Sequence, residues 1–276
     1  MKQKTVGKSG SIEGVGLHTG RKARVFVEPA EPNKGLRFFR DGIRVEGIFS
    51  SARCTAIGRK SLSLATVEHL LSALTGLGVT NADIGVTGPE IPILDGSAAD
   101  WVQFLKKLGV IDQPAPLAVH RIAEPIFCHD EKAALAVYPA DDLRVSYALN
   151  CRHPLLADQK VDFLMDAGVY EREIAPARTF CTEEEAQVLK KKGFGRGADF
   201  KNTLVIGAKG PLQNRFRFVD ECARHKVLDL LGDLALAGFA VKGHVVGLRS
   251  GHALNHELVK KIIYQSMTTK RAYNEK

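Results

Sequence analysis

The spacing of hydrophobic residues alternates between strand-like and helix-like along the first half of the chain. Its predicted elements follow the order strand, strand, helix, strand, helix. They lie at residues 23–29, 35–39, from Thr66 to Gly76 or Gly78, 82–88 and 97–109. Thr66 and Ser97 stand where the two helices begin, so we expect their hydroxyls to cap free amide groups. Asp100 is placed to complete a capping box with Ser97, and Gly109 is placed to end that helix.

The second half repeats this order. Its predicted strands and helices lie at residues 134–140, 143–150, from Asp220 onward, 241–248 and 252–266. Between the halves, Pro114, Pro116 and Pro125 interrupt any helical period and predict a linker near residues 112–122.

The repeated order predicts an α+β fold of two similar domains, at residues 1–117 and 122–268. Each domain would be a β-sheet with two helices on one face and a small insert. Burying both apolar helix layers requires them to pack against each other between the two sheets. Residues 183–211 form the insert of the second domain, with a short helix, a glycine-rich basic loop and a strand. Insertions of this kind often form part of a binding site.

Composition narrows the class of protein. The chain has 276 residues, of which 45% are hydrophobic and 25% charged, as in folded globular proteins. The longest apolar run, at 228–241, is broken by Asp and Gly, which predicts no transmembrane helix. The N-terminus lacks the apolar segment of a secretory signal, and the five cysteines are scattered singly. We therefore expect a cytoplasmic protein with reduced thiols.

The net charge of +8 predicts an anionic partner without choosing one. Lysines and arginines are spread along the chain rather than gathered in a basic stripe with aromatic residues between them. This distribution argues against a nucleic-acid partner. A basic nucleic-acid-binding protein with incidental histidines is the alternative outside the enzyme class, and it predicts binding that weakens steeply with salt.

One predicted helix carries an imidazole and two carboxylates along a single face. His225, Asp229 and Asp233 lie at positions i, i+4 and i+8, beside a stripe of leucines and valine. An imidazole and a carboxylate one turn apart are spaced to hold one metal ion. The alternative is a solvated helix face with an ion pair between Lys226 and Asp229.

A second pair strengthens the metal hypothesis. Glu68 and His69 are adjacent on the polar side of the first predicted helix, where a lone histidine would more often be a surface residue. An adjacent acid and imidazole can supply a general base and a metal ligand. With His225 and Asp229, His69 would complete two imidazoles and one carboxylate, the ligand set of a hydrolytic zinc site with its fourth position left to water. His252 begins the last helix, where the alternative is a helix-start histidine without a chemical role. Because the helix layers face each other and the two residues lie in consecutive elements of one domain, His252 and Asp233 could meet.

Several motifs together resemble one enzyme family. They are GVGLHTG (14–20), TVEHLLSAL (66–74), EIPILDGSA (90–98), ARTF (177–180), RHKVLDLLGD (224–233) and SGHALN (250–255). In this order, from about residue 4 to residue 268, they resemble the UDP-3-O-acyl-N-acetylglucosamine deacetylase family. The resemblance implies a cytoplasmic zinc amidohydrolase that removes the N-acetyl group from a UDP-linked, 3-O-acylated glucosamine, the committed step of lipid A biosynthesis. It also implies two β-sheet domains with helices sandwiched between them.

The resemblance assigns roles to residues of this sequence. It implies that zinc is held by His69, His225 and Asp229, the same three residues that spacing suggests. Other matched positions imply a general base, a catalytic histidine with its orienting acid, an oxyanion donor and a lysine near the site; in that order they are Glu68, His252, Asp233, Thr179 and Lys226.

Substrate contacts are also implied. Phe180 matches a family position near the substrate, and residues 183–211 match a hydrophobic passage for the acyl chain that Phe194, Leu204 and Ile206 could line. Arg249 stands where many members have lysine, and either cation can neutralise a diphosphate, although arginine does so as a planar fork. We expect a monomer. The alternative within the enzyme class is a zinc hydrolase with a similar site that acts on a different amide or ester.

Overall fold

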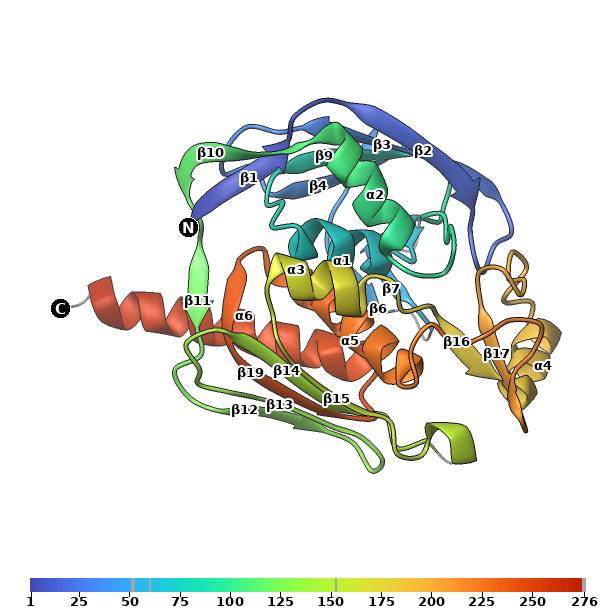
Figure 1. Ribbon diagram of the computed structural model, residues 1–276. Coiled ribbons are helices and arrows are strands. Elements are labelled where there is room, and N and C mark those ends of the chain that lie inside the picture. Colours follow the sequence, from blue (N-terminus) through green and yellow to red (C-terminus); the bar gives the residue numbers. More distant parts are fainter. Residues whose placement is uncertain (51–52, 60, 152, 275–276) are drawn as a thin grey trace.

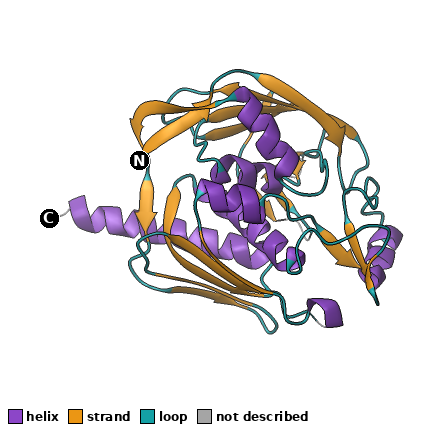
Figure 2. Ribbon diagram, viewed as in Figure 1, coloured by secondary structure: helices purple, strands orange, loops and turns teal. Residues whose placement is uncertain are grey.

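Two β-sheets enclose helices α1 (Glu68–Gly76), α2 (Ala99–Leu108), α5 (Glu221–Leu234) and α6 (His252–Asn274) (Figures 1 and 2). The computed structural model describes residues 1–50, 53–59, 61–151 and 153–274. This arrangement confirms the predicted α+β fold with helix layers packed between two sheets.

The first sheet has five strands. In spatial order they are β2 (Gly10–Val15), β3 (Lys22–Pro29), β9 (Ala82–Val86), β4 (Leu36–Arg40) and β5 (Ile43–Val45). Alternate residues of β3 point into the core, so Val25 and Val27 are fully buried while their neighbours are exposed. Helices α1 (Glu68–Gly76) and α2 (Ala99–Leu108) lie on the core side of this sheet (Figure 1).

The second sheet repeats the plan. Its main path is β12 (Ile126–His129), β13 (Ala134–Tyr138), β19 (Ala240–Leu248), β14 (Leu143–Ala148) and β15 (Lys160–Leu164). In both sheets the strand that follows the first helix of the pair runs antiparallel to one neighbour and parallel to the other, as β9 does between β3 and β4 and β19 does between β13 and β14. Helices α5 (Glu221–Leu234) and α6 (His252–Asn274) face the core from this sheet.

Helices α1 and α5 pack directly against each other across the middle of the molecule. At Gly232 of α5 an added Cβ would overlap the backbone carbonyl of Glu68, so the close approach of the helices requires a glycine. One hydrophobic core runs through both halves and includes the fully buried Trp101, Leu70 and Leu228.

The stretch predicted to be a linker contains strands. β10 (Val110–Pro116) pairs antiparallel with β1 (Lys2–Val6), and β11 (Val119–Arg121) adds to β19. The prolines are tolerated because β10 pairs on one side only, so a missing amide proton costs no ladder hydrogen bond on its other side. Residues 112–122 are therefore mostly in strands, and the linker and the domain division at 117 and 122 stay predictions.

Some of the residues predicted to begin or end helices do so, and others do not. Thr66 does not cap α1, because its φ of +58° is not the extended conformation of a capping residue, and its hydroxyl donates to Glu90 instead. Ser97 accepts from the first amide of α2, but Asp95, rather than Asp100, accepts from the Ser97 amide. Gly109 ends α2 with φ of +77°, as predicted.

Each half also carries a small three-stranded sheet. The first is β6 (Ile48–Ser50), β7 (Thr55–Arg59) and β8 (Leu62–Ala65); the second is β16 (Phe180–Thr182), β17 (Leu204–Gly207) and β18 (Gly210–Pro211). Helix α4 (Glu183–Lys191) lies beside the second, at one side of the molecule (Figure 1). Thr182 and Glu185 form a complete capping box at its start, which the sequence analysis missed.

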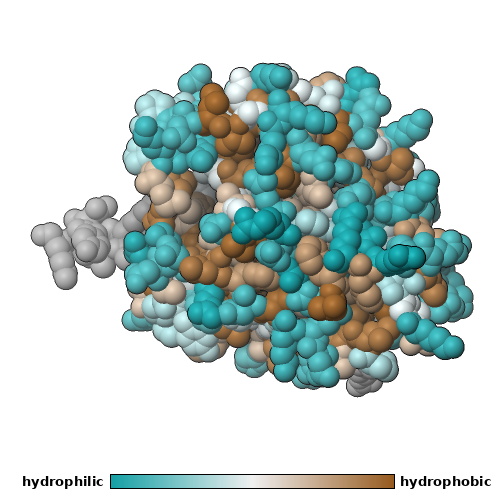
Figure 3. Space-filling model, viewed as in Figure 1, coloured by the Kyte–Doolittle hydropathy of each residue, from teal (hydrophilic) through white to brown (hydrophobic). Residues whose placement is uncertain are grey.

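Short helical turns complete the structure, at Pro154–Leu156, Ala167–Val169 (α3), Tyr170–Ile174 and Ala235–Ala237. Hydrophilic and hydrophobic residues are interspersed on the face shown in Figure 3. Within the described ranges, no helix is both long enough and apolar enough to cross a bilayer.

Candidate metal centre and the proton-transfer cluster

The three predicted metal ligands converge between α1 and α5. Asp229 Oδ1 lies 3.3 Å from His225 Nε2 and 3.9 Å from His69 Nε2. One ligand atom from each residue lies within 4.8 Å of the others, and all three side chains are buried. His69 comes from the first turn of α1, whereas His225 and Asp229 lie one turn apart on α5. Both halves of the chain therefore contribute to the set.

Neighbouring groups orient these ligands. His225 Nδ1 lies 3.0 Å from the carbonyl oxygen of Ala177, to which it donates, so Nε2 is left to face His69 and Asp229. Lys226 Nζ donates to Asp229 Oδ2 at 2.6 Å, which leaves Oδ1 toward the two imidazoles. The rings of His69 and His225 are 5.0 Å apart and nearly perpendicular.

The protonation states suit a metal. Burial, followed by the neighbouring His225, lowers the pKa of His69 to about 3. Burial also lowers the pKa of His225, although Asp229 opposes this. Burial alone would raise the pKa of Asp229, but Lys226 and His225 outweigh it and hold that pKa well below its usual range. Two neutral imidazoles and an ionised carboxylate are the donors that a divalent zinc or iron ion requires, so the residues present fit such an ion.

A second buried cluster adjoins the first. His252 Nδ1 lies 2.8 Å from Asp233 Oδ2, so the expected meeting of His252 with Asp233 occurs. On its other side, His252 Nε2 lies 3.7 Å from Glu68 Oε1. Burial is the main reason that the pKa of Glu68 is raised, with His252 opposing the shift. Burial would lower the pKa of His252, but Asp233 and then Asp229 and Glu68 outweigh it and raise that pKa.

Known proteins resemble this chain over nearly its whole length. A family model described as UDP-3-O-acyl N-acetylglycosamine deacetylase matches residues 3–264. The chain belongs to this deacetylase family. Three of its relatives are named UDP-3-O-acyl-N-acetylglucosamine deacetylase. The protein of Aquifex aeolicus is 39% identical over 97% of this chain and 95% of the relative. That of Anaeromyxobacter dehalogenans is 39% identical, and that of Syntrophotalea carbinolica 37%, each over 95% of this chain and 87% of the relative.

The alternative of a solvated helix face is wrong for the stripe on α5. His225, Asp229 and Asp233 are at most 5% exposed, because α5 is covered by α1 on one side and by the second sheet on the other. The Lys226–Asp229 pair of that alternative does form, but in a buried setting. The polar side of α1 is likewise turned inward, toward α5, rather than to solvent.

The remaining deacetylase-family positions lie at different distances from the cluster. Thr179 is two residues beyond Ala177, and its amide donates to the carbonyl of Gly96 at 2.8 Å. The ring of Phe180 is 6.3 Å from that of His225. Phe194 is 39% exposed and lies edge-on to the ring of His18, 5.7 Å away.

Arg249 is exposed just beyond β19, and its backbone amide donates a hydrogen bond to the carbonyl oxygen of Ala148. In the described part of the chain, no hydrogen bond, ion pair or ring contact joins Phe194 or Arg249 to the three metal ligands. Leu204 and Ile206 are buried in the main core, so Phe194 alone of the three expected passage residues has exposed surface.

Several residues near the site were missed by sequence analysis. Thr55 and His256 contact Asp233, and Asn255 Nδ2 donates to Asp233 Oδ2 at 2.8 Å. The i, i+4 spacing of His256 after His252 was a usable signal. Thr55 lies on a strand distant in sequence, and no local pattern indicates its place.

The GVGLHTG loop of the family is tied to the site by Glu90. This buried carboxylate accepts from the amides of His18 and Thr19 at 2.8 and 2.7 Å, and from the Thr66 hydroxyl at 3.0 Å. Burial lowers the pKa of His18, which Glu90 opposes and the charges of Arg53 and His252 reinforce. Glu90 therefore links this loop to Thr66, which lies directly before Val67 and α1.

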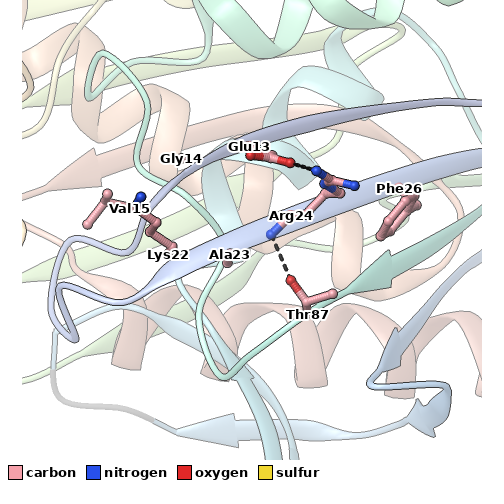
Figure 4. Close-up of a pocket in the computed structure, with 8 residues that line it drawn as sticks. All are labelled: Glu13, Gly14, Val15, Lys22, Ala23, Arg24, Phe26 and Thr87. Carbon is pink, nitrogen blue, oxygen red and sulfur yellow. Dashed lines mark hydrogen bonds and ion pairs between the residues drawn. The ribbon is translucent and has the colours of Figure 1, made fainter.

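A hollow on the outer surface lies elsewhere. It is formed on β2 and β3 and includes Glu13, Arg24, Phe26 and Thr87 (Figure 4). The Arg24 amide donates to the Thr87 hydroxyl at 2.9 Å, and the Arg24 side chain pairs with Glu13. The lining of this hollow contains none of the residues predicted to act in catalysis.

Proposed function

We propose that this protein is a zinc-dependent deacetylase that hydrolyses the N-acetyl amide of UDP-3-O-(3-hydroxyacyl)-N-acetylglucosamine and releases acetate. This is the proposed committed step of lipid A biosynthesis. The observation that carries the proposal is the juxtaposition, inside the helix layer, of a ligand set (His69, His225 and Asp229) and a proton-transfer set (Glu68, His252 and Asp233). The names of its relatives supply the substrate.

His69, His225 and Asp229 would hold the ion. A bound zinc ion supplies Lewis-acid chemistry, since it polarises the amide carbonyl and makes water a stronger acid. Ferrous iron suits the same two imidazoles and carboxylate, so the donor set does not select between these ions.

Glu68 acts as the general base in this proposal. Its Oε2 accepts from the Thr55 amide at 3.1 Å, which fixes the carboxylate and leaves Oε1 to take a proton from the attacking water. Once ionised, Glu68 is a stronger base than an exposed carboxylate, because burial raises its pKa. Positioned proton transfer of this kind contributes about 10²–10⁴ in rate.

His252 acts as the general acid. Its raised pKa keeps the imidazole protonated, and Asp233 at Nδ1 stabilises that cation and points Nε2 toward Glu68. The Nε2 proton is delivered to the nitrogen of the leaving amine as the amide bond breaks. Asp233 remains ionised, since its own pKa is held below the usual range by His252 against the effect of burial.

Thr179 and Lys226 complete the proposed site. The Thr179 hydroxyl would donate to the oxyanion of the tetrahedral intermediate, a role that contributes about 3–4 kcal/mol for a well-placed donor. Lys226 balances the charge of Asp229 beside it. Phe180 would contact the sugar, Arg249 the diphosphate, and Phe194 with residues 183–211 the acyl chain. We also propose a cytoplasmic monomer.

An acetate-release assay tests the function. Purified protein is incubated with UDP-3-O-acyl-N-acetylglucosamine, alone, with a chelator, and with zinc restored after chelation. We expect release of one acetate per substrate, loss of release on chelation and recovery with zinc. Absence of release by metal-loaded protein would refute the substrate, and release that is indifferent to chelation would refute the metal. Release from an unrelated acetamide at an equal rate would favour a hydrolase of broader substrate class.

A further inference from the structure

Thr55 lies between the two groups that transfer protons. It is the first residue of β7 and is fully buried. Its amide donates to Glu68 Oε2 at 3.1 Å, and its carbonyl accepts from the Val67 amide at 3.1 Å, directly before α1. Its hydroxyl contacts Asp233 Oδ1. One residue therefore touches both the carboxylate of Glu68 and the carboxylate that holds His252.

The hydrogen-bond directions around this hydroxyl are determined by its neighbours. An ionised Asp233 can only accept, so Thr55 donates its single proton to Oδ1. The lone pairs of the hydroxyl then face His256 Nε2 at 3.0 Å and His252 Nδ1 at 3.1 Å. Both imidazole nitrogens must carry a proton there, because an unprotonated nitrogen would face another lone pair.

The same reasoning determines which nitrogen of His256 carries the proton. It is 3% exposed, and its Nε2 also lies 3.3 Å from Asp233 Oδ1. Its Nδ1 has no hydrogen-bond partner among the described residues, so the tautomer with the proton on Nε2 fits the site. His256 thus supplies a donor to Asp233 Oδ1 and the Thr55 hydroxyl oxygen, whereas His252 donates to Asp233 Oδ2.

We propose that Thr55 and His256 are positioning residues for the deacetylation: they fix the Asp233 carboxylate, and through it the orientation and Nδ1 protonation of His252. Thr55 additionally holds Glu68, so it sets the spacing between base and acid. This inference rests on the proposed function, because it assigns a task to His252 in that reaction. Neither residue touches the metal ligands in the contacts described above, so the effect is on turnover and not on metal binding.

Paired variants at each position test the proposal. Thr55→Val removes the hydroxyl and keeps the shape and the amide, whereas Thr55→Ser keeps the hydroxyl. His256→Leu removes the donor, whereas His256→Gln can place an amide N–H where Nε2 lies. We expect kcat to fall about tenfold in Thr55→Val and about fivefold in His256→Leu, with KM and zinc content within about twofold of wild type. Thr55→Ser and His256→Gln should recover to within about threefold of wild type.

Thr5 provides a matched control. It is buried on β1, and its hydroxyl accepts from the Ala30 amide at 3.1 Å, far from the cluster in the sheet plan. Thr5→Val removes an equally buried hydroxyl and should leave kcat within about twofold of wild type. If kcat in Thr55→Val stayed within twofold of wild type, if Thr55→Ser were no better than Thr55→Val, or if zinc were lost, the role of Thr55 would be overturned.

A spectroscopic readout separates this inference from the proposed activity. In ¹⁵N-histidine spectra of zinc-loaded wild type, we expect His256 to carry a single proton, on Nε2, and His252 to carry protons on both Nδ1 and Nε2. Thr55→Val should shift the His252 Nδ1 signal, and Thr5→Val should not. A His256 protonated on Nδ1 alone would overturn the inference even if the enzyme releases acetate. Inactive wild-type protein with the expected signals would instead refute the proposed function and leave the hydrogen-bond assignment supported.

Discussion

The helix layer and the insert differ in almost every physical respect. Five of the proposed site residues on α1 and α5 are at most 5% exposed: Glu68, His69, His225, Asp229 and Asp233. Charged groups pair with them, as Lys226 does with Asp229 and His252 with Asp233. Helix α4 of the insert has no buried residue, and Phe194 beside it is 39% exposed. In the proposed function, the proton transfers therefore lie where geometry is fixed, and the acyl-chain contacts lie where side chains can adapt.

The largest expected effect is on the base. Glu68→Gln keeps the shape and the bond from the Thr55 amide but cannot take a proton, so activity should fall by about two orders of magnitude or more. Zinc content, measured by atomic absorption, should stay unchanged. Glu257→Gln, on the exposed side of α6, is the control and should retain activity. Near wild-type turnover in Glu68→Gln would remove Glu68 from the mechanism.

His252→Ala should behave in the same way. The variant loses the proton donor but none of the proposed ligands, so turnover should fall by about two orders of magnitude while zinc remains bound. Steady-state kinetics and metal analysis on the same sample check this. Loss of zinc together with activity would show that the two clusters do not act separately.

The next effect is on metal binding. Asp229→Asn removes the charge that faces both imidazoles and leaves Lys226 buried without its partner. Zinc affinity should weaken by at least about tenfold, and activity at limiting zinc should fall with it. Competition with a chromogenic chelator measures the affinity. The exposed Asp142→Asn is a charge-matched control, and an unchanged affinity in Asp229→Asn would rule out its role as a ligand.

A substitution in the packing of the helix layer should have a smaller effect, on the free energy of unfolding. Gly232→Ala places a methyl group against the Glu68 carbonyl, which should cost about 1–3 kcal/mol of unfolding free energy. Gly85→Ala, whose Cβ would make ordinary contact with Phe26, should change it by less than about 0.5 kcal/mol. Urea denaturation checks both, and equal stability of the two variants would contradict the close approach of α1 and α5.

The insert should show the smallest effect. Phe194→Ala should raise KM for a long-chain acylated substrate by about tenfold or less and leave kcat nearly unchanged. This variant is cleaner than deletion of residues 183–211, because the deletion would also remove Leu204 and Ile206 from the core. An equal loss on a UDP-amino sugar without the acyl chain would argue against an acyl-binding role.

Some features that depend on residues close together in the sequence were predicted correctly. The spacing of His225, Asp229 and Asp233 follows from one helical period, and it indicated their shared stripe correctly. The repeated order of elements predicted two facing helix layers, and so the meeting of α1 with α5. Burial of that stripe could not be read from its polarity, because its covering comes from the other half of the chain.

Features that depend on distant partners were missed. Thr66 was expected to cap a helix, but the buried Glu90 draws its hydroxyl away. Pro114 and Pro116 indicated a linker, but an edge strand accommodates them beside β1. Thr55 has no sequence signal at all, since its importance arises only when β7, α1 and α5 come together.

The seam between α1 and α5 has one further consequence. Neither repeat of the fold carries a complete chelating set, since one imidazole comes from α1 and the other, with the carboxylate, from α5. An ion held there would fasten the two repeats to each other, so its affinity would measure how tightly they are docked, and metal release would be an early sign that the repeats are beginning to part.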